Sequence, residues 1–169
     1  MLRRALQLAA CVVLFASATR LPAGAGSESL ENYTRVIVAP TRTSIYVGSV
    51  AMTMPTFVRA GTAFASDYRA RVFPYFFYNE NGRLTVELPD ESLHKLQRGE
   101  PVDFVGRAVR EDGAERRVEG RATPTDSSQG KLKVRVIYSR RIELIFNTTY
   151  RFPDVLPSGA KTASQMATP

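Results

Sequence analysis

Residues 131–138 read KLKVRVIY, and this stretch decides the fold class of the chain. Apolar side chains alternate with cations along it: Leu132, Val134, Val136 and Tyr138 against Lys131, Lys133 and Arg135. Successive side chains of a β-strand point to opposite faces, so a period of two is typical of a strand. The stretch therefore predicts a strand with its apolar face in the core and its basic face in water.

Runs of the same kind extend outward on both sides, from Tyr33 to Arg151. The expected strands include 35–39, 43–54, 102–110, 115–123 and 142–152. One short helix is expected at about 90–98, with acids in its first turn and a glycine after its last. The fold class is therefore all-β: an antiparallel β-sandwich or a partly closed barrel of about eight strands. In element order alone, the helix resembles that of an oligonucleotide/oligosaccharide-binding barrel.

Two of these segments carry further expectations. Residues 43–54 change phase at Gly48-Ser49, which predicts a β-bulge inside a single strand. Strands 102–110 and 115–123 are expected to form a hairpin with the loop 112–114. In that register Gly106 faces Gly120, leaving a gap that a large side chain could fill.

Asn81-Gly82 gives the strongest local turn signal. The pair accepts the positive φ angles of a type I′ turn, so it predicts a two-residue hairpin loop. The resulting register leaves Phe76 and Tyr78 on the polar face of the hairpin, together with Arg83. Aromatic rings on a polar face either bind a partner or are covered by another part of the chain.

Residues 1–25 have the three zones of a cleavable signal peptide: a basic start, an apolar run over 5–16 and small residues before the cut. The cut is expected after Ala25, with Ala18 as the alternative. The apolar run is shorter than the roughly 20 residues that span a bilayer, so no transmembrane segment is expected after cleavage. Cys11 lies inside the apolar run, which argues against a lipid anchor at this cysteine.

The remaining chain is expected to hold one domain. Residues 26–33 are expected to be frayed, 34–152 to form a single β domain and 153–169 to be a disordered tail. Without residues 1–25 the chain has no cysteine and carries 20 basic and 16 acidic residues, a net charge of +4. This excess is too small to predict a nucleic-acid partner. An exported domain without disulfides is expected in the bacterial periplasm or outside the cell.

The residue types for most site chemistry are missing from the mature sequence. His94 is its single histidine, and zinc needs three or four nitrogen or sulfur ligands, so we expect no catalytic, metal or cofactor site. One enzymatic alternative is a hydrolase of envelope glycan, because paired carboxylates can come from distant strands. The acids expected on strands are Glu87, Asp103, Glu119 and Glu143.

Two surfaces are expected to recognise a partner: an envelope glycan, an acidic surface or a protein. The first comprises Phe76, Tyr78 and Arg83. The second is the outward basic face of the later strands, which could hold a polyanion; its residues are Arg107, Arg117, Arg121, Lys131, Lys133 and Arg135. The sequence thus predicts a soluble, exported, non-catalytic binding or scaffolding domain. An alternative is an assembly subunit that joins its neighbour through an edge strand.

Overall fold

The computed structural model describes residues 29–139 and 142–156. Its strands are β1 (Arg35–Val38), β2 (Thr41–Ile45), β3 (Gly48–Thr53), β4 (Phe57–Ala60), β5 (Ala63–Phe73), β6 (Glu80–Glu87), β7 (Val102–Arg110), β8 (Glu115–Pro124), β9 (Gln129–Ser139) and β10 (Ile142–Arg151). One helix, α1 (Asp90–Gln97), connects β6 to β7, and two 3₁₀ turns span Leu30–Asn32 and Phe76–Tyr78. No helix in the described part of the chain has the length and hydropathy of a membrane span.

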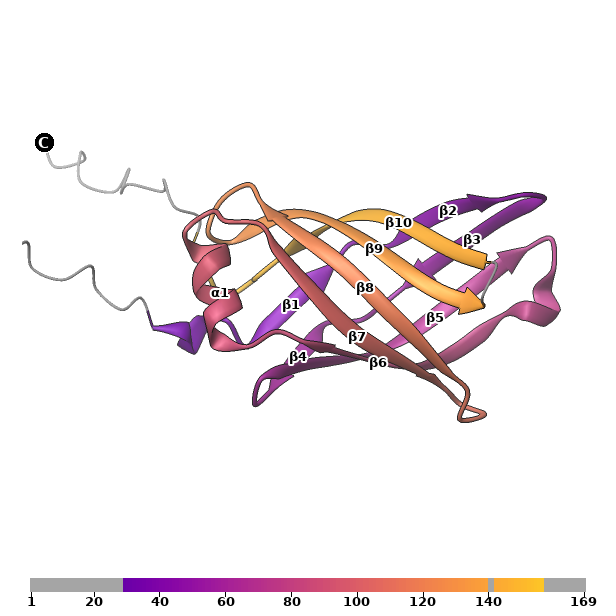
Figure 1. Ribbon diagram of the computed structural model, residues 1–169, viewed down its shortest axis with the longest axis horizontal. Helices are drawn as coiled ribbons and strands as arrows, with labels where there is room; N and C mark the ends of the chain where they lie inside the picture. Colours follow the sequence, from indigo (N-terminus) through magenta and orange to yellow (C-terminus); the bar gives the residue numbers. More distant parts are fainter. Residues whose placement is uncertain (1–28, 140–141, 157–169) are drawn as a thin grey trace, which may run out of the picture.

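The sheet closes on itself. β1 and β4 to β10 each pair antiparallel with the next of these strands in the chain, and β10 pairs back onto β1, which gives a closed eight-stranded barrel. β2 and β3 form a hairpin that continues the barrel wall at one end, because β3 pairs with the last residues of β5 (Figure 1). The expected all-β class is confirmed, as a barrel. Its up-and-down order differs from the Greek-key order of an oligonucleotide/oligosaccharide-binding barrel.

The apolar faces of the strands fill the barrel interior. Phe146 is 1% exposed and Val118 is equally buried. Along the segment 131–138, Val136 is buried while Leu132 and Val134 pack against the core, so the alternation assigned the inner face correctly. An eight-stranded barrel has an interior about wide enough for side chains to fill.

Phe104 lies on the inner side of β7, partly buried and packed against the core. Its ring lies over Gly120 on the neighbouring strand, where an added Cβ would come 2.1 Å from Phe104 Cζ. The expected register was therefore wrong by two residues, since Phe104 faces Gly120 and Gly106 faces Val118. The loop is 111–113, not 112–114, because Gly113 takes a φ of 83°. The gap expected at Gly120 does exist, and a ring of the adjacent strand fills it.

Two expected turns were wrong. Residues 43–54 form the hairpin β2–β3, not one bulged strand, and the chain reverses at Tyr46-Val47. Asn81-Gly82 lies inside β6. Glycine is required at position 82 for close packing, since a Cβ there would lie 2.2 Å from the carbonyl oxygen of Val109. The reversal before β6 is made instead by residues 74–79.

Helix α1 covers one end of the barrel (Figure 1). Its own residues Leu93 and Leu96 face the barrel and are buried. Tyr33, expected to be frayed, packs at the same end: its ring centroid lies 4.5 Å from that of Phe152 and its hydroxyl donates a 2.7 Å hydrogen bond to the carbonyl oxygen of Ser127. Residues 29–33 therefore belong to the domain, because the barrel end offers an apolar partner for Tyr33.

The C-terminal boundary also moves outward. Asp154 Oδ1 lies 2.6 Å from Arg35 Nη2, and Val155 packs against the core, so residues 153–156 are part of the domain and not of a free tail. The expected signal peptide, 1–25, and the remainder of the expected tail, 157–169, lie outside the described residues.

Candidate binding surfaces

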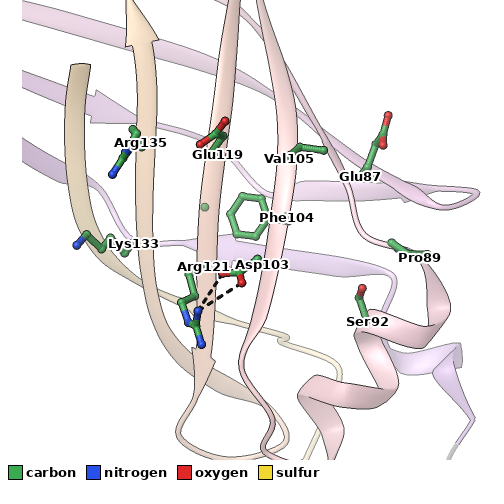
Figure 2. A pocket seen from close by; sticks show the side chains of 11 residues that line it. Glu87, Pro89, Ser92, Asp103, Phe104, Val105, Glu119, Arg121, Lys133 and Arg135 are labelled. Carbon is green, nitrogen blue, oxygen red and sulfur yellow. Dashed lines mark hydrogen bonds and ion pairs between the residues drawn. The ribbon is translucent and has the colours of Figure 1, made fainter. Parts of the chain in front are cut away.

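An open groove of about 640 Å³ crosses the outer face of β7, β8 and β9 beside α1 (Figure 2). It brings together three of the four strand carboxylates: Glu87, Asp103 and Glu119. Glu87 and Glu119 both face Val105 from opposite sides, which separates their backbones by two strand spacings, about 10 Å. Glu143 does not line this groove.

Two of the groove's three acids are already engaged. Asp103 accepts bonds from Arg121 Nη1 at 3.3 and 3.4 Å, and Glu119 lies 2.9 Å from Arg117 Nε. A glycosidase needs one carboxyl to donate a proton and another to act as base or nucleophile. Here only Glu87 lacks an ion-pair partner among the described residues, so the groove holds one free acid instead of a pair.

The expected polyanion surface is largely neutralised by its own acids. Arg107 pairs with Glu115 at 3.3 Å and Arg135 with Glu143 at 3.5 Å, in addition to the pairs of Arg117 and Arg121. Lys131 and Lys133 are the two members of the set without an ion pair to a described residue. A polyanion would therefore have to displace the four carboxylates that already pair with the arginines of this face. The face is a surface of mixed charge.

A polar cluster that the sequence did not reveal lies inside the barrel, at the end away from α1. Glu80 Oε2 lies 3.4 Å from Arg110 Nε and 3.9 Å from Arg116 Nη2, and the Tyr68 hydroxyl donates to Glu80 Oε1 at 3.1 Å. The Arg116 guanidinium lies over the Tyr138 ring, 4.3 Å from its centroid. The residues of this cluster are far apart in the sequence. A strand pattern assigns the apolar residues to the inner face, so it does not predict charged side chains inside the barrel.

The free space within the barrel is small. Two apolar cavities of about 60 and 70 Å³ both border Phe104. Benzene occupies an engineered cavity of about 150 Å³ in another protein, so neither space accommodates a ring-sized ligand. The interior is a packed core.

The burial of two tyrosine hydroxyls, those of Tyr68 and Tyr150, makes the fold less stable at alkaline pH. Desolvation, and then the charge of Glu80, raise the pKa of Tyr68, and desolvation raises the pKa of Tyr150. An unfolded tyrosine titrates at about 10. A raised folded pKa gives stability that is complete below pH 10 and is lost as the pH rises above it.

We therefore expect the free energy of unfolding to fall above pH 10, by up to about 1.4 kcal/mol per pH unit for each phenol. Urea unfolding of Tyr68→Phe should show a shallower fall than the wild type. Tyr78→Phe, at an exposed tyrosine, is the matched control. Equal slopes for wild type and Tyr68→Phe would contradict the assignment.

The six exposed aromatic residues of the described chain belong to two connections, the β2–β3 turn and the end of β5 with residues 74–79, which lie at the barrel end opposite α1 (Figure 1). We call this surface the aromatic tip; its residues are Tyr46, Phe73, Tyr75, Phe76, Phe77 and Tyr78. Phe76 is 65% exposed, Phe77 77% and Tyr78 56%. No other described element covers Phe76 and Tyr78, so both rings face solvent. Phe73, Tyr75 and Phe77 were missed because the sequence predicted a regular strand over 75–78, and Tyr46 was missed because 43–54 was expected to be one strand.

Backbone pairing brings the two halves of the tip together. Ser49 of β3 faces Phe73 of β5, which sets the β2–β3 turn beside the start of the 74–79 connection. Gly48 permits this approach, because its φ is 118° and an added Cβ would lie 1.9 Å from the Phe73 carbonyl oxygen. Within residues 73–78 the rings pack in pairs, with centroids 6.0 Å apart for Phe73–Phe76 and 4.6 Å for Phe77–Tyr78.

Arg83 is not part of the tip. It lies on the wall of the barrel opposite Asp67 of β5, with 3.7 Å between Arg83 Nη1 and Asp67 Oδ1. The structure therefore keeps Phe76 and Tyr78 together and separates Arg83 from them.

The chain was compared with known proteins, and no family model, no curated protein and no solved structure matches it.

Proposed function

We propose that this chain is an exported, non-catalytic binding module that docks onto a component of the bacterial envelope, or of the space outside it, through the aromatic tip. The observation that carries the proposal is the exposure of Phe76, Phe77 and Tyr78 on one protruding end of a rigid barrel. Export rests on the signal-peptide pattern of residues 1–25.

Exposed rings in this number have an energetic consequence. Burying a fully exposed phenylalanine side chain contributes about 2 kcal/mol, so these three rings, which are 56–77% exposed, offer about 4 kcal/mol toward association. A contiguous patch of exposed apolar residues marks an interaction site in a monomeric domain far more often than scattered single residues do. None of the three rings is buried in the barrel core, so all three are free to contact a partner.

The proposal is tested by site-specific photo-crosslinking in a bacterial host that expresses the full chain. A photoreactive phenylalanine analogue at Phe77 should crosslink to an envelope component, and Phe76→Ser with Tyr78→Ser should reduce that product at least tenfold. The matched control is the analogue at Val58, which is also exposed but lies on β4. The size of the product reports export, since a chain cut after Ala25 or Ala18 is shorter.

Each outcome has a clear meaning. A crosslink to lipid, glycan or a foreign protein from position 77 alone supports docking through the tip. Crosslinks to a second copy of the chain would support the alternative of an assembly subunit, for which β2 offers an edge at the end of the strand order. Equal products from positions 77 and 58, or none from 77, would refute the proposal.

A further inference from the structure

Two arginines close to the aromatic tip, Arg42 and Arg71, lack the ion pairs that neutralise most of the arginines on the barrel wall. Arg42, Arg69 and Arg71 are exposed and form no ion pair with a described residue, whereas Arg107, Arg117, Arg121 and Arg135 all do. The nearby acids Glu80 and Asp112 are both within ion-pair distance of Arg110. Arg69 lines a hollow together with the acids Asp67 and Glu111, so the unpaired positive charge beside the rings is that of Arg42 and Arg71.

The arginines lie at a defined depth behind the tip. Arg71 precedes Phe73 by two residues on β5, so both side chains point to the outer face and their backbones are about 7 Å apart. Arg42 of β2 and Arg71 both face Ala51 of β3, which puts them in one row across the sheet. A row of cations thus stands behind a layer of aromatic rings.

We propose that the aromatic tip inserts into the headgroup region of an anionic phospholipid bilayer, with Arg42 and Arg71 on lipid phosphates. The inference rests on the proposed docking function and names its target. Apolar groups of interfacial proteins enter the bilayer by about 5–10 Å, and this depth brings the Arg42–Arg71 row to the phosphate level.

The order of the two layers, rings in front and cations behind, favours lipid over a protein partner. Tyrosine has an apolar body and a polar end, and it is enriched where hydrocarbon meets water. The aromatic tip contains three tyrosines, Tyr46, Tyr75 and Tyr78, among its phenylalanines. Cations set back from inserted rings meet the negative potential of an anionic leaflet. A protein docking site has no requirement for this layered order.

Tryptophan fluorescence gives a direct test, because the chain contains no tryptophan. Phe77→Trp keeps a ring at the tip and introduces a single reporter. We expect its emission to shift to shorter wavelength on adding phosphatidylcholine vesicles that contain phosphatidylglycerol, and much less with phosphatidylcholine alone. Val58→Trp, at an exposed site of β4, should not respond. All variants begin at the same residue, so any vesicle binding by the residues before Ser29 is the same in each and does not affect the comparison.

Charge variants test the arginine row. Arg42→Gln with Arg71→Gln in the Phe77→Trp protein should weaken binding to the anionic vesicles about thirtyfold, as expected for two arginines at about 1 kcal/mol each. Arg117→Gln with Arg121→Gln removes the same charge from the paired face and should leave binding unchanged. Thermal unfolding of each variant confirms that the barrel is intact, since all four arginines are exposed.

Three results would overturn the inference: no spectral shift with anionic vesicles, equal shifts with both lipid compositions, or equal losses for the two charge variants. A crosslink from position 77 to a protein would also overturn it while leaving the proposed docking function in place. Absence of any crosslink together with absence of vesicle binding would remove both.

Discussion

Replacing Phe104 with alanine lowers the free energy of unfolding by about 3–4 kcal/mol. The ring borders both interior cavities, of about 60 and 70 Å³, so its removal joins them into one larger void. Loss of apolar contact and formation of the void both destabilise the barrel. Urea titration followed by circular dichroism measures the change, and a constant slope with denaturant shows that the unfolded state is unaltered.

The neighbouring strand provides a matched test of this register. Gly120→Leu alone should also destabilise, by about 3 kcal/mol, because a Cβ at Gly120 lies 2.1 Å from the Phe104 ring. Phe104→Ala combined with Gly120→Leu should recover about half of the loss, since the leucine fills the space that the ring leaves. Strictly additive losses in the double variant would show that the two residues do not share one space.

The second large effect is expected at Glu80. Glu80→Gln removes the carboxylate that lies beside Arg110 and Arg116 and that accepts a hydrogen bond from the Tyr68 hydroxyl. The Glu80 and Arg116 side chains are 13% and 14% exposed, so Arg116 is left with little water and no carboxylate partner, whereas Arg110 keeps Asp112 at 3.1 Å. Breaking a buried ion pair costs about 3–5 kcal/mol, and partial exposure reduces this to about 2–3 kcal/mol.

A surface pair on the same barrel is the control for Glu80. Glu119→Gln breaks the ion pair with Arg117, whose side chain is 68% exposed, and should cost less than about 1 kcal/mol. Arg116→Met in the Glu80→Gln background should restore part of the stability, because it removes the uncompensated charge. Equal costs for Glu80→Gln and Glu119→Gln in thermal unfolding would contradict a special role for the interior cluster.

A periodic pattern of apolar and polar residues shows which face of a strand or helix is buried, and this part of the fold was predicted from the sequence. The alternation in 131–138 identified the inner face of β9, and the acids, leucines and glycine of 89–99 identified α1. Phe76 and Tyr78 stood out as apolar residues on a polar face, and they are exposed. The recognition role that they suggested remains a proposal.

The pattern gave no information on which strand lies beside which. Asn81-Gly82 has a strong turn preference, yet it lies within β6, since the long β5 pairs with β6 along eight residue pairs and Gly82 is needed beside Val109. Cross-strand packing of this kind outweighs the local preference of a dipeptide. The same limit hid the Arg42–Arg71 row, because its members are far apart in the sequence.

Local sequence is enough to specify amphipathic strands and one short helix, because apolar and polar residues recur with periods that the backbone geometry fixes. Contacts between distant segments close the strands into a barrel, place Phe104 over Gly120, and bring aromatic rings and unpaired arginines to one end. These outcomes depend on register and on contacts between distant segments. A two-residue change of register, such as the one between β7 and β8, leaves the same side chains on the inner face, so the alternation along a strand does not determine it.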